Sequence, residues 1–264
     1  MKKANNMDNN LNSKVAIVTG SSRGIGKAIV LEMARAGADV VVAARTEVEG
    51  KKLPGTIHQT ANEIRALDRQ VLAIKTDLTQ EKDVENLVSQ TLSHFGHIDI
   101  LVNNAGVSTR GTLLEIPLRH YDLLWSVSVR GAIMCIKAVL PHMIARRAGS
   151  IINLSSTASF AATEPDLEKK LGARTSIAYS MTKAALNVLT VGLAKEMAQH
   201  NITVNAFEPL GTATEGMLAL HPEAPTIAMQ SPQMWGKYAV LVACSKLNGK
   251  LLTEEMLRKQ FGPV

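Results

Sequence analysis

Short apolar runs alternate with longer stretches of helical spacing along almost the whole chain. The apolar runs predict strands over Lys14–Gly20, Ala38–Arg45, Gln70–Asp77, His97–Gly106, Gly149–Ser156 and Asn201–Phe207. Between them, apolar residues recur with the helical period over Gly26–Gly37, His58–Leu67, Gln80–Phe95, Leu118–Arg146 and Ala178–Gln199. Strands that alternate with helices pair through right-handed crossovers, so the pattern predicts an α/β fold. We expect a doubly wound parallel sheet with helices on both faces.

The pattern shows no division of the chain into separate parts. No linker rich in Pro, Gly or Ser interrupts it, so we expect a single domain over residues 14–264 after a flexible polar tail at residues 1–13. Beyond Asn248 the sequence predicts a short strand and then a helix of acidic and basic residues. The helix over Ala178–Gln199 is apolar nearly all round, which predicts burial, with one face available to a second copy.

Charge and composition narrow the class of partner. The net charge of +6 is mild and dispersed, so we expect no nucleic acid partner. The chain has no unbroken run of eighteen apolar residues, so we expect no membrane span. The N-terminus lacks the apolar segment of a secretory signal, and Cys135 and Cys244 lack metal-ligand spacing. We therefore expect reduced thiols, no metal site and a cytoplasmic location.

A glycine-rich stretch, "TGSSRGIG" over Thr19–Gly26, joins the first predicted strand to the first predicted helix. Glycines permit a tight turn and a close approach of the backbone to a diphosphate, and the helix N-terminus favours the anion. A purely structural turn is the alternative. We expect a nucleotide cofactor on residues of this stretch, namely Gly20, Ser22, Arg23, Gly24, Ile25 and Gly26.

The end of the second predicted strand indicates which nucleotide is bound. Dinucleotides without a 2′-phosphate usually need an acidic residue about 20 residues past the glycine-rich loop. Arg45 stands there, and Arg23 lies in the loop itself. A guanidinium suits a phosphate and offers nothing to a free ribose diol, so NADP is expected, with NAD as the alternative. A solvated arginine at a strand end would look the same in sequence.

Tyr179 stands four residues before Lys183 on a predicted helix, so the two side chains lie one turn apart on the same face. An ammonium beside a phenol should lower the pKa of the phenol toward neutral pH and make a proton donor or acceptor. The alternative is a core tyrosine beside a lysine that reaches solvent.

Taken with "NNAG" at Asn103–Gly106, the serines of "NLSS" before "YSMTK", and the later "VNAFEP", the motifs resemble the short-chain dehydrogenase/reductase family. They occur in the family's order and cover about Lys14 to Met217. The resemblance implies a Rossmann-like sheet of about seven strands and a nicotinamide cofactor. It also implies a small-molecule carbonyl or alcohol substrate and a homodimer or homotetramer.

The resemblance also implies roles for particular residues. Tyr179 matches the general acid/base, Lys183 would hold the nicotinamide ribose, and Ser156 would hydrogen-bond the substrate oxygen. Further positions match the family's contacts to adenine, to adenosine and to the carboxamide, namely Asp77, Leu78, Asn104, Ala105, Gly106, Pro209, Thr212 and Thr214.

The chain departs from the family pattern in three places. Ser128, in "VSVRG", stands where the family usually has the asparagine that supports a proton-relay water. The glycine that usually follows the proline comes one place late, at Gly211. Thr163–Arg174 lengthens the connection between Ser156 and Tyr179, either as a gate over the substrate or as a solvated insertion.

These motifs leave three functional hypotheses. The leading one is an NADP(H)-dependent oxidoreductase that acts on a small alcohol or ketone through the Ser-Tyr-Lys group. A 3-oxoacyl-thioester reductase and a weakly catalytic nucleotide-binding sensor are the alternatives. The Ser-Tyr-Lys group argues against the sensor, and Ser128 argues for it.

Overall fold

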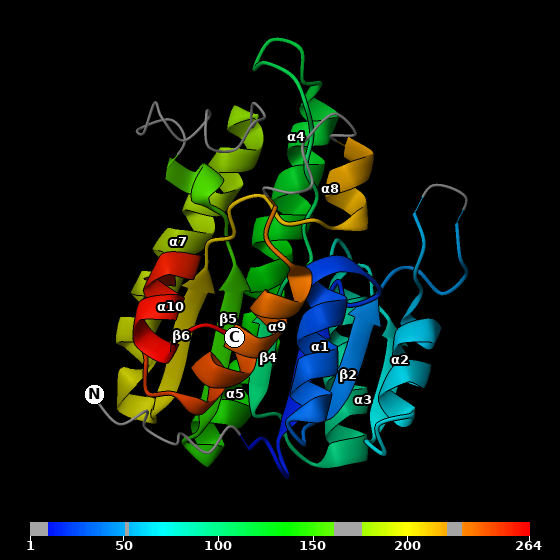
Figure 1. The fold of residues 1–264 in the computed structure, drawn as a ribbon, viewed down its shortest axis with the longest axis vertical. Helices are drawn as coiled ribbons and strands as arrows, with labels where there is room; N and C mark the ends of the chain where they lie inside the picture. The colour runs from blue at the N-terminus through cyan, green and yellow to red at the C-terminus, as the bar shows by residue number, and fades with distance from the viewer. Residues whose placement is uncertain (1–9, 51–52, 161–175, 221–228) are drawn as a thin grey trace.

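The computed structural model describes residues 10–50, 53–160, 176–220 and 229–264 (Figure 1). The predicted gate over Thr163–Arg174 lies outside these described residues.

Seven parallel strands form one sheet in the order β3-β2-β1-β4-β5-β6-β7. This confirms the predicted Rossmann-like fold. The strand order reverses between β1 and β4, and ligands of such sheets bind beyond the carboxyl ends of the strands near that point. The strands are β1 (Val15–Thr19), β2 (Asp39–Ala44), β3 (Val71–Lys75), β4 (Ile100–Asn103), β5 (Gly149–Leu154), β6 (Ile202–Phe207) and β7 (Leu251–Leu252).

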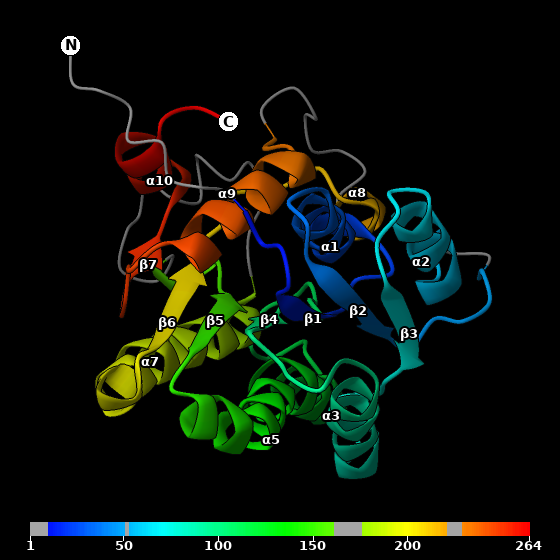
Figure 2. The same cartoon turned by 90° about the horizontal axis from the view of Figure 1, so that it is seen from below.

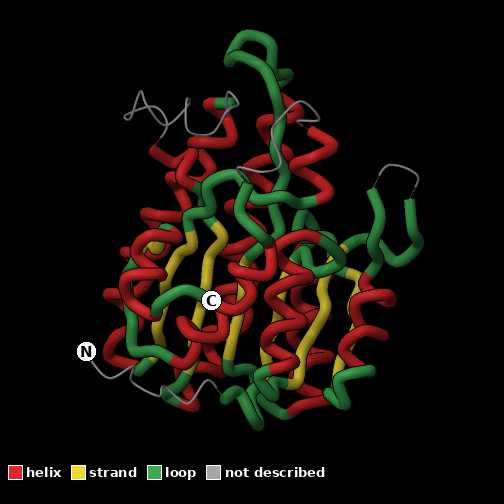
Figure 3. The backbone as a smooth tube through the Cα atoms, in the orientation of Figure 1, coloured by secondary structure: helices red, strands yellow, loops and turns green. Residues whose placement is uncertain are grey.

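Helices cover both faces of the sheet (Figure 2). One face carries α1 (Gly24–Arg35), α2 (Ile57–Arg65), α9 (Pro232–Cys244) and α10 (Glu254–Phe261). The other carries α3 (Glu81–Phe95), α5 (Gly131–Arg146) and α7 (Ile177–Met197). Two short helices lie beyond the carboxyl ends of the strands, α4 (Leu118–Trp125) and α8 (Glu215–Leu220), where loops also gather (Figures 1 and 3).

Each face of the sheet has its own hydrophobic core. Met33 of α1, Phe207 of β6 and Trp235 of α9 are fully buried in the first core. Leu101 of β4 and Val139 of α5 are fully buried in the second. Strands such as β1 face both cores, so their sequences are unbroken apolar runs. This pattern is the reason that the strands could be predicted from the sequence.

The structure corrects three details of the predicted organisation. The predicted helix over Leu118–Arg146 contains a π-helical turn at Ser126–Arg130 between α4 and α5. The sequence analysis missed α9, whose tertiary partner is α1. Leu11 is buried against the first core, so packed structure begins inside the predicted tail. The division into one tail and one domain otherwise stays a prediction.

Two helical stretches bear on the expectation that the chain has no membrane span, which stays a prediction. Among the described residues, the continuous helical stretches Leu118–Arg146 and Ile177–His200 are long and apolar enough to cross one, by length and composition only. Half of the most apolar window of each is buried within the fold. Core helices meet the same criteria, so these stretches are weak evidence for a span.

Candidate active site

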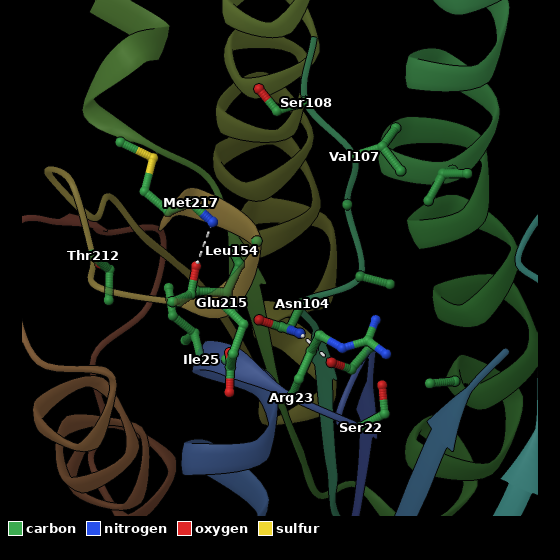
Figure 4. A pocket seen from close by; sticks show the side chains of 18 of the residues that line it. Ser22, Arg23, Ile25, Asn104, Val107, Ser108, Leu154, Thr212, Glu215 and Met217 are labelled. Atoms are coloured by element: carbon green, nitrogen blue, oxygen red, sulfur yellow. Dashed lines mark hydrogen bonds between the residues drawn. The ribbon is translucent and has the colours of Figure 1, made fainter. Parts of the chain in front are cut away.

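A cavity of about 520 Å³ lies at the carboxyl ends of the strands (Figure 4). The residues predicted for catalysis and for the cofactor meet there, apart from Gly26 and Ser128, which do not line it. The predicted residues that line the cavity are Gly20, Ser22, Arg23, Gly24, Ile25, Arg45, Asp77, Leu78, Asn104, Ala105, Gly106, Ser156, Tyr179, Lys183, Pro209, Thr212 and Thr214.

The glycine-rich loop turns sharply between β1 and α1. Gly20 and Gly24 have φ angles of +69° and +59°, a region that disfavours side chains other than glycine. A Cβ on Gly26 would overlap the amide of Asn104, so this glycine permits close packing beneath the loop. The Asn104 amide nitrogen donates to the carbonyls of Thr19 (2.8 Å) and Gly20 (3.2 Å). Asn104, predicted to line the adenosine side, therefore also fixes the shape of the loop.

Tyr179 and Lys183 project from the first turns of α7. Ser176 caps this helix by accepting a hydrogen bond from the backbone N–H of Tyr179 (3.3 Å). Lys183 is buried, and its ammonium donates to the Leu154 carbonyl at the end of β5 (2.5 Å). The Lys183 Nζ also lies 5.4 Å from the centroid of the Tyr179 ring. The tyrosine, the lysine and Ser156 thus meet at one side of the cavity.

The pKa values in this group differ from the sequence-based expectation. Burial raises the pKa of Tyr179, and a hydrogen bond with Ser156 offsets only part of this rise. Burial also lowers the pKa of Lys183 to about 8. The prediction that Lys183 lowers the pKa of Tyr179 was therefore wrong for this structure. The reason is geometric, because the lysine directs its ammonium at the Leu154 carbonyl and is itself desolvated.

Ser128 lies in the π-helical turn, behind Gly106. Its side chain is 1% exposed, and its hydroxyl has no hydrogen-bond partner among the described residues. The Ser128 Oγ and the Lys183 Nζ both lie within 3.7 Å of the point that a Cβ on Gly106 would occupy. The polar groups of Ser128 and Lys183 therefore approach the same small space, which is polar enough for a bridging water.

We expect Ser128→Asn to raise kcat by no more than about tenfold, roughly 1.4 kcal/mol of barrier. A hydroxyl can still donate and accept one hydrogen bond, so the relay should already work with serine. The measurement is kcat across pH for both proteins with one active ketone. A gain of several hundredfold would mean that the wild-type relay is broken, and would favour the sensor hypothesis.

Arg45 and Arg23 lie at the adenosine end of the cavity. The Arg23 guanidinium donates to the carbonyls of Pro54 (2.7 Å) and Gly55 (2.9 Å), so it braces the loop after β2. Arg45 is exposed and has no hydrogen-bond or ion-pair partner within the described ranges. At the same end, Oδ1 of Asp77 accepts from the backbone and hydroxyl of Thr79, which orders the turn after β3. Arg45 is thus the arginine available to a ligand phosphate.

Sequence reasoning missed a buried carboxylate, Glu208, at the end of β6. Its Oε1 accepts from the amide of Asn187 (2.7 Å) and the hydroxyl of Ser159 (3.3 Å). The next carbonyl, that of Pro209, accepts from the Ser156 hydroxyl (3.3 Å). Glu208 therefore ties together the segments that carry Ser156 and Lys183. A charged residue directly after a buried strand, in "FEP", was the available signal.

Glu208 should make the stability of the protein pH-dependent. Burial raises its pKa above the ordinary value of 4.5. Its contribution to stability is therefore complete below about pH 4.5 and is lost as the pH rises through the folded value. We expect the melting temperature of wild type, relative to Glu208→Gln, to fall by about 2 °C or more between pH 4 and pH 7. Glu255→Gln, at an exposed position, is the control, and an equal pH dependence in both variants would contradict the prediction.

The cavity also has an apolar wall that the sequence did not predict. It includes Val107, Ala158, Met217 and Leu220, which belong to the same lining as Ser156 and Tyr179. These residues come from the loop after β4, from the 3-10 turn Thr157–Phe160 and from α8, which meet only in the fold, and no sequence signal marked them. Figure 4 shows Val107 and Met217 among the side chains around the cavity.

The lining fits a nicotinamide dinucleotide. Thr212, at the expected carboxamide position, is buried, and its hydroxyl has no hydrogen-bond partner among the described residues. An unpaired buried hydroxyl is unfavourable, so a ligand amide here would satisfy it. At the other end, Gly20 and Gly24 leave backbone without side chains at the start of α1. A parallel sheet with such a loop at its switch point defines a dinucleotide-binding protein.

Comparisons with known proteins place the chain in a family. The short chain dehydrogenase model matches residues 14–224. Hydroxysteroid dehydrogenase-like protein 2 of Bos taurus is 36% identical over 93% of this chain, and the match covers 57% of that relative. A short chain dehydrogenase homolog from Mycobacterium thermoresistibile has a TM-score of 0.83 at 30% identity, covering 95% of this chain and 88% of its own.

A short-chain type dehydrogenase/reductase from Mycobacterium marinum has a TM-score of 0.78 at 29% identity, covering 93% of this chain and 94% of its own. The chain therefore belongs to the short-chain dehydrogenase family, whose members are oxidoreductases that bind NAD or NADP. It spans less than two thirds of the length of the hydroxysteroid dehydrogenase-like relatives.

Proposed function

We propose that the chain is an NADP(H)-dependent oxidoreductase that interconverts an alcohol and a ketone through Ser156, Tyr179 and Lys183. The observation that carries the proposal is their convergence in one cavity with the glycine-rich loop. Ser156 and Tyr179 line the same cavity, and Lys183 is buried beside the ring. Tyrosine, serine and lysine in this arrangement form an acid/base group and an oxyanion donor.

The raised pKa of Tyr179 keeps the phenol protonated near neutral pH, which is the form that gives a proton to a carbonyl oxygen. Ser156 can donate a hydrogen bond to the same oxygen. Lys183, with its pKa near 8, is close to the operating pH and can return the proton to Tyr179 through neighbouring polar groups. The bound nicotinamide would supply or accept the hydride, and Thr212 and Thr214 would hold its carboxamide.

Arg45 supports NADP over NAD as the cofactor. Its exposed guanidinium lines the cavity and has no partner among the described residues. A guanidinium binds phosphate through charge-assisted hydrogen bonds.

The apolar wall supports a substrate with an apolar body beside its carbonyl. Val107, Ala158 and Met217 offer contact but no charge. The name of the Bos taurus relative indicates a dehydrogenase like those of hydroxysteroids, which agrees with this chemistry. None of these wall residues carries a positive charge, so they give less support to a thioester carried on an acidic phosphopantetheine group.

The test is NADPH oxidation with a panel of apolar and polar ketones, beside NADPH and NADH binding by fluorescence. We expect turnover with apolar ketones. Tight NADPH binding without turnover on any ketone would favour the nucleotide-binding sensor.

We also propose that the chain forms a homodimer or homotetramer through α4 and α7, which pack against each other. Leu118 and Val188 are more than three-quarters exposed there, although both are large and apolar. Light scattering on wild type and Val188→Lys would test the interface. We keep the cytoplasm as the proposed location, on the basis of the sequence alone.

A further inference from the structure

Glu215, the first residue of α8, places a carboxylate in the dinucleotide cavity. Its Oε2 is buried and has no hydrogen-bond partner within the described part of the chain. This oxygen lies 3.7 Å from the point that a Cβ on Gly24 would occupy. Figure 4 shows the side chain pointing toward the start of α1, beside Ile25.

This carboxylate lies close to the start of α1, a region that favours an anion. Gly24 is the first residue of α1, and the backbone N–H groups at a helix N-terminus attract negative charge. In this fold the diphosphate of a dinucleotide binds at the same point. A carboxylate and a diphosphate cannot both stay there without strong repulsion.

The residues around Glu215 do not neutralise it. Arg23, in the same loop, directs its guanidinium to the carbonyls of Pro54 and Gly55. No ion pair joins it to Glu215 among the described residues. Among the described residues, the carboxylate therefore has no hydrogen-bonded partner near the start of α1, so a stronger anion can displace it.

Two glycines lie close to Glu215 in the chain, one on each side of it. No described atom lies within 4 Å of a Cβ built on Gly216, the next residue. Gly211, at the other end of this connection, is equally open among the described residues and has a φ angle of +39°. Glycine restricts the backbone least, so a rotation at these two positions is the route by which Glu215 would leave the loop.

We propose that Glu215 is an internal competitor of the cofactor: its carboxylate takes the position of the diphosphate and must leave when a dinucleotide binds. The inference rests on the proposed function, because it assumes that the cavity binds NADP(H). Glu215 then lowers the affinity for the dinucleotide and speeds its release. Fast release matters because the departure of a product often limits turnover in such enzymes.

The test compares wild type with Glu215→Gln, which keeps the shape of the side chain and removes its charge. We expect the Kd for NADPH, measured by fluorescence, to fall about tenfold, mainly through slower release in stopped-flow experiments. The Kd for 2′-AMP should not change, because this ligand has no diphosphate. Glu85→Gln, an exposed carboxylate on α3, is the charge-matched control and should bind NADPH like wild type.

Each outcome separates the two proposals. Equal or weaker NADPH binding by Glu215→Gln, with an unchanged melting temperature, would overturn the competitor. An equal gain for 2′-AMP, or for Glu85→Gln, would also overturn it, because the effect would then be one of general charge. If wild type and Glu215→Gln bind neither NADPH nor NADH, the proposed function itself fails and the competitor fails with it. If Glu215→Gln binds a dinucleotide and wild type does not, the result would support the proposal that Glu215 competes with the cofactor.

Discussion

Tyr179→Phe should lower kcat by about a thousandfold and leave the Kd for NADPH within about twofold of wild type. The phenol is the group placed to exchange a proton with the substrate oxygen, and phenylalanine cannot do so. The ring itself can still pack against Val107 and the small core around Ile116, Leu124 and Ala178. Cofactor binding should therefore survive. The measurements are steady-state kinetics with one active ketone and fluorescence titration with NADPH.

A second tyrosine, Tyr238, provides a control that separates a loss of catalysis from a loss of stability. Tyr238 is buried in α9, and its hydroxyl donates to the Gly262 carbonyl (2.9 Å), away from the cavity. Tyr238→Phe should lose one hydrogen bond, about 1 kcal/mol of stability, and keep its kcat. A Tyr179→Phe protein with a near-normal rate would remove the Ser-Tyr-Lys mechanism from consideration.

Arg45→Asp should reverse the choice of cofactor. We expect the Kd for NADPH to rise about a hundredfold, because a charge-assisted hydrogen bond is lost and a like charge faces the 2′-phosphate. The new carboxylate can accept hydrogen bonds from a ribose diol, so NADH binding should stay equal or improve. Titration of both proteins with both dinucleotides measures the change in preference.

The control for this substitution is Lys259→Asp, an equal change of charge at an exposed position of α10. It should leave both Kd values unchanged. If wild type binds NADH at least as tightly as NADPH, the role given to Arg45 is wrong. Arg23 cannot bind the 2′-phosphate in place of Arg45, because its guanidinium donates to two backbone carbonyls.

The parts of the site that the sequence predicted are those fixed by the local geometry of the backbone. The i, i+4 spacing of Tyr179 and Lys183 put both side chains on one face of α7, and the structure has them beside each other. The loop over Thr19–Gly26 lies between a strand and a helix, as its glycines required. Local spacing is fixed by backbone geometry, so it survives into the fold unchanged.

Tertiary structure decided the properties that depend on neighbours far along the chain. Burial, rather than the spacing to Tyr179, lowers the pKa of Lys183 to about 8. Glu208 meets Asn187 and Ser159 only because β6, α7 and the turn after β5 converge. Glu215 comes near Gly24 across nearly the whole chain.

The sequence by itself thus determined the strands of the sheet and most of the helices between them, and it proposed the residues that could do the chemistry. Apolar periodicity and turn residues act over a few positions, and this is enough to specify those features. Charge states, hydrogen-bond partners and the place of the Glu215 carboxylate depend on desolvation and on contacts between distant segments. Those quantities do not exist until the chain is folded, so only the tertiary structure could decide them.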